Sequence, residues 1–406
     1  MKDKTWLYLL CLAEMGTMMV LLNYSAVLPI IRQEWGLTYT EAGLIYSAYQ
    51  VGYILLAVIL TTLTDFVDTR KIYIFSALWA GLAGIAFAIF ADSFPSALIL
   101  RCLTGFGLAG TYMPGLKMVS ARFSPQKRGW AVGMYVGAFS AGTALSLLFA
   151  GLLTGLFSWR AAMFITSIGP LAGAFIAYRI LDEMPPMRSG GSIGGFKKVF
   201  SNRPAIMVML TYAAHMWEMF GMRGWIVAFL AAILVSRSFD IGLATSYGAI
   251  FSALIILAGG FSTALAGTLS DRFGRVRTIQ AIMLSSAAFS FVFGWIGPLP
   301  LGIIVLASLI YGLLVTAESS VLSTTVTELV PMEYLGSAMA VQSLLGWTAA
   351  AVAPAVFGII LDLTNPPALV AELGYTPNWG PAFIILGLGA LAGPILCFFL
   401  RKSKIR

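Results

Sequence analysis

Long apolar runs recur through the whole of this 406-residue chain, and each is about as long as a helix needs to cross a bilayer. A helix rises 1.5 Å per residue, so about 20 residues cross a hydrocarbon core about 30 Å thick. Apolar residues make up 59% of the sequence, more than a soluble domain carries even when glycine is counted. The sequence therefore predicts an integral membrane protein.

Twelve such runs can be counted, each bounded by charged residues, proline or clusters of glycine. Polar and apolar residues do not alternate in them at the period of a strand, and helices satisfy every backbone polar group inside lipid. We therefore expect an all-α fold with twelve transmembrane helices. The expected spans are 6–30, 41–62, 72–91, 96–120, 129–152, 160–180, 204–234, 243–266, 279–297, 301–323, 335–361 and 380–400.

The distribution of basic residues predicts the orientation. If both termini are cytoplasmic, 19 of the 25 lysines and arginines fall in cytoplasmic segments, which is the positive-inside bias. The basic N-terminus resembles a signal peptide, but its apolar run continues past Met18 without a small-residue cleavage site, so we expect it to be retained as the first span. The net charge of +8 is then a topology signal, and no nucleic-acid-binding motif accompanies it.

The chain contains an internal repeat. A stretch rich in proline, glycine, serine and basic residues, 181–203, has the composition of a cytoplasmic linker and separates six spans from six. A shift of 206 residues lays "TTLTDFVDTRK" (61–71) on "GTLSDRFGRVR" (267–277) with threonine, leucine, aspartate and a final basic residue in register. Duplicated halves are typical of secondary transporters. We expect two pseudo-symmetric six-helix bundles, 1–180 and 204–406.

The second copy of this repeat resembles the G-x-L-S-D-R-x-G-R signature of the major facilitator superfamily. The first copy departs from the signature at Thr61, Phe66 and Asp68. "RCLTG" (101–105) resembles the family's fourth-helix R-x-x-Q-G pattern, with Thr104 in place of glutamine. The resemblance covers the whole chain and implies a transporter whose two bundles alternate access to a central site. The matching residues of the second copy are Gly267, Leu269, Ser270, Asp271, Arg272, Gly274 and Arg275.

Spans four and seven are similar to those of bacterial permeases of the superfamily labelled as nitrate/nitrite or cyanate-type. This resemblance implies a monomer in the bacterial cytoplasmic (inner) membrane. The asparagine and glycine-rich signature of nitrate carriers is missing from span five, "GMYVGAFSAGTALSLLFAG", so nitrate itself is a poor candidate. The same span lacks the G-P-x-x-G-G ending of drug/proton antiporters.

We expect the charged segment 267–278 to be a cytoplasmic loop between spans eight and nine. Asp271 can there meet a helix N-terminus or a basic partner, and the glycines permit a tight reversal. The resemblance favours a latch that closes the cytoplasmic side, and a loop that only sets topology is the alternative. The expected gating residues are Asp65, Arg70, Lys71, Gly267, Asp271, Arg272, Gly274 and Arg275.

Several spans retain ionisable side chains, each of which costs about 2.5 to 3.5 kcal/mol at mid-membrane on insertion scales. Such side chains normally face a cavity or a partner. Glu14 shares helical spacing with Met18, Leu21 and Ser25. The expected substrate and proton pathway comprises Glu14, Tyr24, Arg101, Tyr112, Lys117, His215, Glu218, Arg223 and Glu318.

His215 and Glu218 lie one helical turn apart, so we expect them to share a face and to hydrogen-bond or share a proton. Arg223 can join Glu218 only if the glycines around it distort the helix. The repeat lays Glu318 on Tyr112. Each of these residues also has a purely structural interpretation, as a hydrogen-bonded core group, an interfacial anchor or, for Lys117, a snorkelling ammonium.

These observations favour a proton-coupled secondary active transporter. Its expected substrate is a small solute, namely an organic or inorganic anion. Its expected partners are the substrate, protons and the lipid bilayer. Proton-driven efflux of drug-like hydrophobic compounds and a non-transporting membrane sensor are the alternatives. One histidine excludes a His-Glu-x-x-His zinc site, and no phosphate-binding glycine loop is found. We therefore expect no metal, no cofactor and no enzyme activity.

Overall fold

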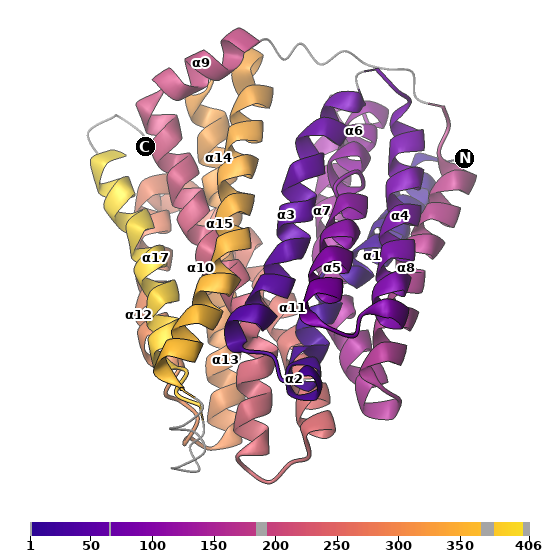
Figure 1. Cartoon of the computed structure of the whole chain (residues 1–406). Coiled ribbons are helices and arrows are strands. Elements are labelled where there is room, and N and C mark those ends of the chain that lie inside the picture. The colour runs from indigo at the N-terminus through magenta and orange to yellow at the C-terminus, as the bar shows by residue number, and fades with distance from the viewer. Residues whose placement is uncertain (1, 65, 184–192, 367–376, 401–406) are drawn as a thin grey trace. The chain divides into compact units, whose positions relative to one another are not determined.

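The computed structural model describes residues 2–64, 66–183, 193–366 and 377–400. Within these ranges the regular elements are all helices (Figure 1). The first helices are α1 (Asp3–Thr17), η1 (Met18–Val20), α2 (Asn23–Trp35), α3 (Tyr39–Leu63), α4 (Thr69–Phe90), α5 (Phe94–Leu108), α6 (Tyr112–Arg122), α7 (Pro125–Leu156) and α8 (Trp159–Ile180). They are followed by α9 (Ile193–Ser201), α10 (Arg203–Val235), α11 (Ile241–Phe273), α12 (Arg275–Phe293), α13 (Leu301–Ala317), α14 (Ser319–Leu329), η2 (Met332–Tyr334), α15 (Leu335–Thr364) and α17 (Gly380–Leu400).

The helices confirm the all-α membrane fold. In the described part of the chain, eleven helical stretches are long and apolar enough to cross a membrane, and α3 coincides with the remaining expected span. Three expected spans are interrupted helices, namely α1 with η1 and α2, α5 with α6, and α13 with α14. Part of the predicted linker forms α9, which precedes α10 directly.

Backbone contacts divide the chain into two compact units. Unit 1 contains residues 1–37, 44–189 and 226–253, and unit 2 contains residues 38–43, 190–225 and 254–406. This division differs from chain order in two places, since the start of α3 belongs to unit 2 and parts of α10 and α11 belong to unit 1. The division of the chain into bundles 1–180 and 204–406 stays a prediction.

In unit 1, α4 packs against α5 and α8, and α1 packs against α7 and α8. The crossing of α3 and α5 brings the two backbones into direct contact. A Cβ on Gly105 would overlap the carbonyl oxygen of Tyr49, and a Cβ on Gly52 would overlap that of Cys102. Small residues at helix crossings permit this approach inside a membrane, so the glycine of the "RCLTG" pattern has a packing role.

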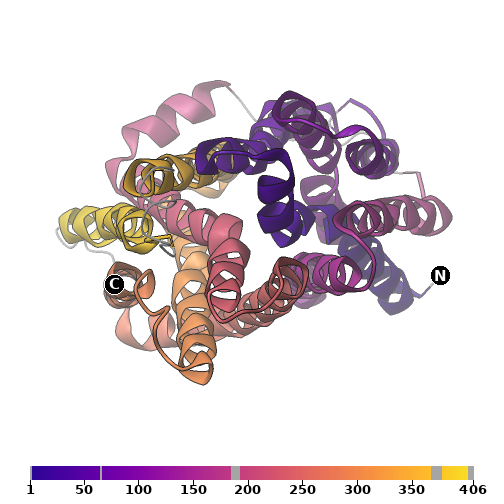
Figure 2. The same cartoon turned by 60° about the horizontal axis from the view of Figure 1, so that its bottom comes forward.

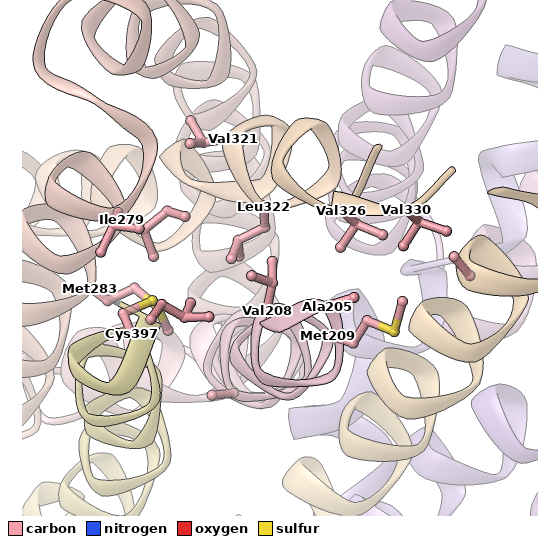
Figure 3. Close-up of a cluster of buried hydrophobic side chains, with 14 of the residues drawn as sticks. Ala205, Val208, Met209, Ile279, Met283, Val321, Leu322, Val326, Val330 and Cys397 are labelled. Carbon is pink, nitrogen blue, oxygen red and sulfur yellow. The ribbon is translucent and has the colours of Figure 1, made fainter. Parts of the chain in front are cut away.

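In unit 2, α12 packs against α13 and α17. The yellow helix α17 lies beside α12 in Figure 2. A cluster of buried apolar side chains joins the ends of these helices to α10 and α14. Figure 3 shows Met283 beside Cys397, and Leu322 of α14 beside Val208 of α10, in this cluster. The three cysteines of the chain are free.

Asp362, near the end of α15, caps the start of α3 within unit 2. Its carboxylate accepts hydrogen bonds from the backbone N–H of Tyr39 at 2.9 Å and of Thr40 at 2.7 Å. The Thr40 hydroxyl donates to the same carboxylate at 2.6 Å. The first N–H groups of a helix have no partner inside it, and an anion there also interacts favourably with the helix dipole. Asp362 thus stabilises a helix end more than 300 residues away in sequence.

Candidate functional site

The predicted pathway residues form two buried groups, one in each unit. Glu14, Tyr24, Arg101 and Tyr112 lie in unit 1, whereas His215, Glu218 and Glu318 lie in unit 2. The three glutamates and the histidine have no exposed surface.

The carboxylate of Glu14, on α1, is held by hydroxyl groups. Tyr135 of α7 donates to its Oε2 at 2.7 Å, Tyr73 of α4 at 3.2 Å and Thr17 at 3.3 Å. The other oxygen, Oε1, has no hydrogen-bond partner among the described residues. Tyr73 and Tyr135 are not among the predicted pathway residues, because a tyrosine in an apolar run is also typical of plain packing. The buried carboxyl therefore has neutral donors at one oxygen and none at the other.

The first span is interrupted just beyond Glu14. Here α1 ends at Thr17, and α2 begins only at Asn23. The expected common face from Glu14 to Ser25 assumed one continuous helix, and this assumption is wrong because the chain passes through a 3₁₀ turn between them. The break contains neither proline nor glycine, so no residue of the usual helix-breaking types announces it.

Arg101 of α5 binds the backbone at this break. Its guanidinium donates to the carbonyl oxygens of Val20 at 3.2 Å and Leu21 at 3.4 Å, and to Asn23 Oδ1 at 3.1 Å. The group also lies 4.9 Å from the ring centroid of Tyr49. Its Nε–H is buried and finds no acceptor in the described part of the chain. Arg101 therefore stabilises carbonyls that the break leaves free and retains one unused donor.

Tyr24 and Tyr112 support these two groups through ring contacts. The Tyr24 ring lies 5.6 Å from the Arg101 guanidinium. Tyr112, the first residue of α6, stacks on Tyr135 with ring centroids 6.1 Å apart. Tyr135 in turn donates the shortest hydrogen bond to Glu14. Tyr112 is thus one residue removed from the buried carboxyl.

Lys117, on α6, lies apart from this group. Its ammonium donates to Thr64 Oγ1 at 2.8 Å and to the Thr64 carbonyl at 3.4 Å. Thr64 follows the last residue of α3, where a cation interacts favourably with the C-terminal end of the helix dipole. The contact with α3 gives Lys117 a protein partner at the helix end.

In unit 2, His215 pairs with Glu318 and not with Glu218, the partner expected from helical spacing. His215 Nδ1 lies 2.8 Å from Glu318 Oε1, and both side chains are fully buried. Glu318 lies at the interruption between α13 and α14. The remaining atoms of the pair, His215 Nε2 and Glu318 Oε2, have no hydrogen-bond partner within the described ranges.

Glu218 has a separate set of partners, again hydroxyl groups. Its Oε1 accepts from Ser290 at 2.8 Å and Ser286 at 2.9 Å on α12, and from Tyr311 on α13 at 3.2 Å. The hydroxyls of Ser290 and Tyr311 also hydrogen-bond to each other. Oε2 of Glu218 is buried without such a partner in the part of the chain that is described. The arrangement repeats that of Glu14, in which hydroxyls bind one carboxylate oxygen.

Arg223 lies on the same helix as Glu218. The distortion that would bring the two together is not observed, since α10 runs as one helix from Arg203 to Val235. The Arg223 guanidinium lies 5.6 Å from the Phe220 ring.

Spans four and ten are interrupted at corresponding positions. The break in span four lies between Leu108 and Tyr112, and the break in span ten lies at Glu318. The 206-residue repeat superimposes Tyr112 on Glu318, so each of these residues lies at a helix break in its own unit. Discontinuous helices are typical of binding sites in transporters, because backbone groups at the break remain available.

The charged segment is helical and not the expected loop. α11 continues to Phe273 and α12 begins at Arg275, with Gly274 alone between them at φ 90°. This φ lies in the region that favours glycine, so the residue permits the reversal. Arg275 bridges Asp271 at 2.5 Å and Glu328 of α14 at 2.9 Å. The basic partner expected for Asp271 is therefore on the neighbouring helix.

The other gating residues take surface positions. Arg70 donates to the carbonyl of Tyr178 at 3.0 Å, and the Arg272 guanidinium lies 5.3 Å from the Phe273 ring. Lys71 is exposed, and a Cβ on Gly267 would meet no atom within 4 Å. Asp65 lies outside the described residues.

The interrupted apolar helices and the buried carboxylates define a polytopic membrane protein of the secondary-transporter class. Residues 10–354 match the family described as Major Facilitator Superfamily. The chain belongs to this superfamily.

Relatives and solved structures are similar over most of the chain. The protein named "Probable sulfoacetate transporter SauU" of Cupriavidus necator is 24% identical over 91% of this chain and 88% of its own. The "Hexuronate transporter" of Bacillus subtilis is 22% identical over 84% of each chain. The crystal structure of a bacterial homologue of the human lysosomal transporter Spinster, inward-facing and occupied, covers 98% of this chain and 96% of its own. It aligns with a TM-score of 0.79 at 16% identity, which shows the shared fold.

These relatives do not support the nitrate/nitrite or cyanate-type resemblance, since they are named for organic solutes. The family and its named transporters make the chain a secondary transporter of small solutes in a membrane.

Proposed function

We propose that this protein carries a small organic anion across the bacterial cytoplasmic membrane by alternating access, coupled to protons. The observation that carries the proposal is Glu14, a fully buried carboxyl that accepts hydrogen bonds from three hydroxyl groups at one oxygen and has no partner at the other among the described residues. A buried carboxylate without a paired cation avoids the large cost of desolvating its charge when it binds a proton. Such a group can take up and release a proton as its surroundings change.

The anionic character of the substrate is supported by Arg101 and by the relatives. Arg101 is buried, its guanidinium lies near the rings of Tyr24 and Tyr49, and its Nε–H has no acceptor among the described residues. A guanidinium recognises carboxylate, sulfonate and phosphate groups well, because its donors lie in one plane. The relatives named for sulfoacetate and hexuronate both carry anions by name, and we infer a substrate of the same class.

Glu218 is a second candidate for the proton-binding group. Its hydroxyl partners on α12 and α13 match those of Glu14 in kind. We propose that one of the two carboxyls binds the transported proton. His215 and Glu318, which already form a pair, then keep a structural role in unit 2.

Transport by purified protein in liposomes tests both the anionic substrate and the proton coupling. We expect an imposed inward proton gradient to drive accumulation of an anion such as sulfoacetate or a hexuronate. Glu14→Gln or Glu218→Gln should retain exchange of substrate but lose accumulation driven by the gradient. Glu333→Gln, at an exposed carboxylate of η2, is the matched control and should accumulate substrate normally. If both buried variants accumulate like the control, proton coupling through these groups is wrong.

The variant Arg101→Lys tests whether the guanidinium recognises the anionic substrate. Lysine keeps the charge but loses the planar set of donors, so we expect at least a tenfold weaker apparent affinity with the protein still folded. Efflux of hydrophobic compounds is the competing function. Protection of growing cells against drugs, abolished by Glu14→Gln, together with no accumulation of any anion, would replace the proposal by that alternative.

A further inference from the structure

The helix α9 is fixed to the end of unit 2, directly before the span formed by α10. Asn202 is the only residue between the two helices, and its Nδ2 donates to the carbonyl of Leu329 at 2.9 Å. Its Oδ1 accepts from the backbone N–H of Ala205 at 3.2 Å. Figure 1 shows α9 lying obliquely at the end of the unit 2 helices. Since α10 is long and apolar enough to cross a membrane and begins at Arg203, we expect α9 to lie near the lipid headgroups.

One face of α9 packs against unit 2 and leaves another face uncovered. Val199 is buried in the apolar cluster of unit 2, and a Cβ on Gly195 would approach Ser337 Oγ of α15 to 2.6 Å. Phe196 and Phe200 are four residues apart, hence on one face, and are 41% and 62% exposed. The neighbouring element η2, which contacts α9, carries a further exposed apolar side chain, Met332, at 81% exposure.

Lys197 borders this apolar face, whereas Lys198, two residues before Phe200, lies on the opposite side of α9. Lys197 and Lys198 are exposed and follow Phe196 directly. A short helix with aromatic side chains on one face and ammonium groups on the next is typical of segments that lie in the membrane interface. The rings enter the boundary between headgroups and acyl chains, and the long lysine stems carry the charges to lipid phosphates.

We propose that α9 is a membrane-surface anchor that binds anionic phospholipid through Lys197 and Lys198 and inserts Phe196 and Phe200 beside the headgroups. The occupant is a lipid of the bilayer that the neighbouring spans cross, because the charges are complementary and the two exposed rings supply an apolar surface beside the ammonium groups. The proposal depends on the membrane location of the fold, and not on which solute is carried.

Spin labels on the two faces test the insertion. A nitroxide is placed at Phe200→Cys or at Lys198→Cys in a chain whose three native cysteines are alanine, reconstituted in vesicles with phosphatidylglycerol. We expect the label at position 200 to be relaxed more by oxygen than by a water-soluble nickel complex, and the label at position 198 to show the reverse. Equal, high accessibility of both labels to nickel would overturn the insertion.

Native mass spectrometry tests the lipid class. We expect the protein to retain phosphatidylglycerol, and Lys197→Gln with Lys198→Gln to lose at least one such lipid. The matched control is Lys127→Gln with Arg128→Gln, an exposed basic pair at the start of α7, which should leave this lipid bound. Equal retention by both double variants, equal retention of phosphatidylcholine, or displacement of the lipid by millimolar inorganic phosphate would each contradict an anionic lipid site.

Discussion

His215 and Glu318 meet at 2.8 Å in the interior of unit 2, although 103 residues separate them in the chain. The pair joins α10 to the break between α13 and α14. Removal of one buried partner leaves the other without its hydrogen bond, which costs about 1 to 3 kcal/mol.

Glu318→Ala should therefore lower the melting temperature of the purified protein. Glu318→Gln should lower it less, because its amide can still hydrogen-bond to the imidazole. Thermal unfolding in detergent compares the two variants directly. Equal melting temperatures for wild type and Glu318→Ala would show that the pair does not stabilise the fold.

Tyr135→Phe removes the shortest hydrogen bond to Glu14, at 2.7 Å. Loss of one buried hydrogen bond of this kind should reduce stability by about 1 kcal/mol. Tyr247→Phe, at an exposed tyrosine of α11, is the control and should leave stability unchanged. The measurement is again thermal unfolding, combined with substrate exchange in liposomes, where only Tyr135→Phe should change the rate.

Gly105→Leu should prevent α3 and α5 from approaching each other. The added side chain would overlap the carbonyl of Tyr49, and overpacking of a tight contact costs about 1 to 3 kcal/mol or more. Gly133→Leu is the matched control, since a Cβ there meets no atom within 4 Å. Yields of folded protein after size-exclusion chromatography should fall for the first variant only. A normal yield of Gly105→Leu would contradict the direct backbone contact.

Asp362→Ala should loosen the start of α3. The carboxylate accepts from two backbone N–H groups there, and loss of an N-terminal cap costs about 1 to 2 kcal/mol. Hydrogen exchange of the amides of residues 39–42 should become faster, while exchange at the start of α4 stays the same. Asp362→Asn keeps an acceptor and should have a smaller effect.

Arg275→Gln tests the proposed latch of the charged segment. Exposed ion pairs contribute about 0 to 1 kcal/mol, so the melting temperature should change little when the bridge to Asp271 and Glu328 is lost. If the segment gates transport, the exchange rate should change nonetheless. An unchanged rate would leave the bridge with a topological role only.

The apolar runs predict the helices well, because membrane insertion imposes length and composition on every span. The extent of α11 and α12 was not predicted, since Asp271 and Arg275 suggested a solvated loop whereas they bridge within a nearly continuous helical hairpin. Helical spacing also cannot predict hydrogen-bond partners that come from distant spans. Helical spacing predicts Glu218 as the partner of His215, whereas in the fold His215 hydrogen-bonds to Glu318 of another span.

The choice between the two buried carboxyls is also a matter of packing and not of sequence. Tyr73 and Tyr135 on the one hand, and Ser286 and Ser290 on the other, are ordinary residues of apolar runs until the fold turns their hydroxyls to one oxygen. A search for hydroxyl-bearing residues on several spans would have named them, along with many others that serve only packing.

The matched interruptions at Tyr112 and Glu318 have a consequence for how the two copies of the repeat diverged. A break supplies free backbone groups in each copy, but one copy places an aromatic ring there and the other an acid. An ancestor with identical halves would have offered the same chemistry twice. The present chain keeps a helix break in both copies, with ring stacking at the break of one half and a hydrogen bond to His215 at the break of the other.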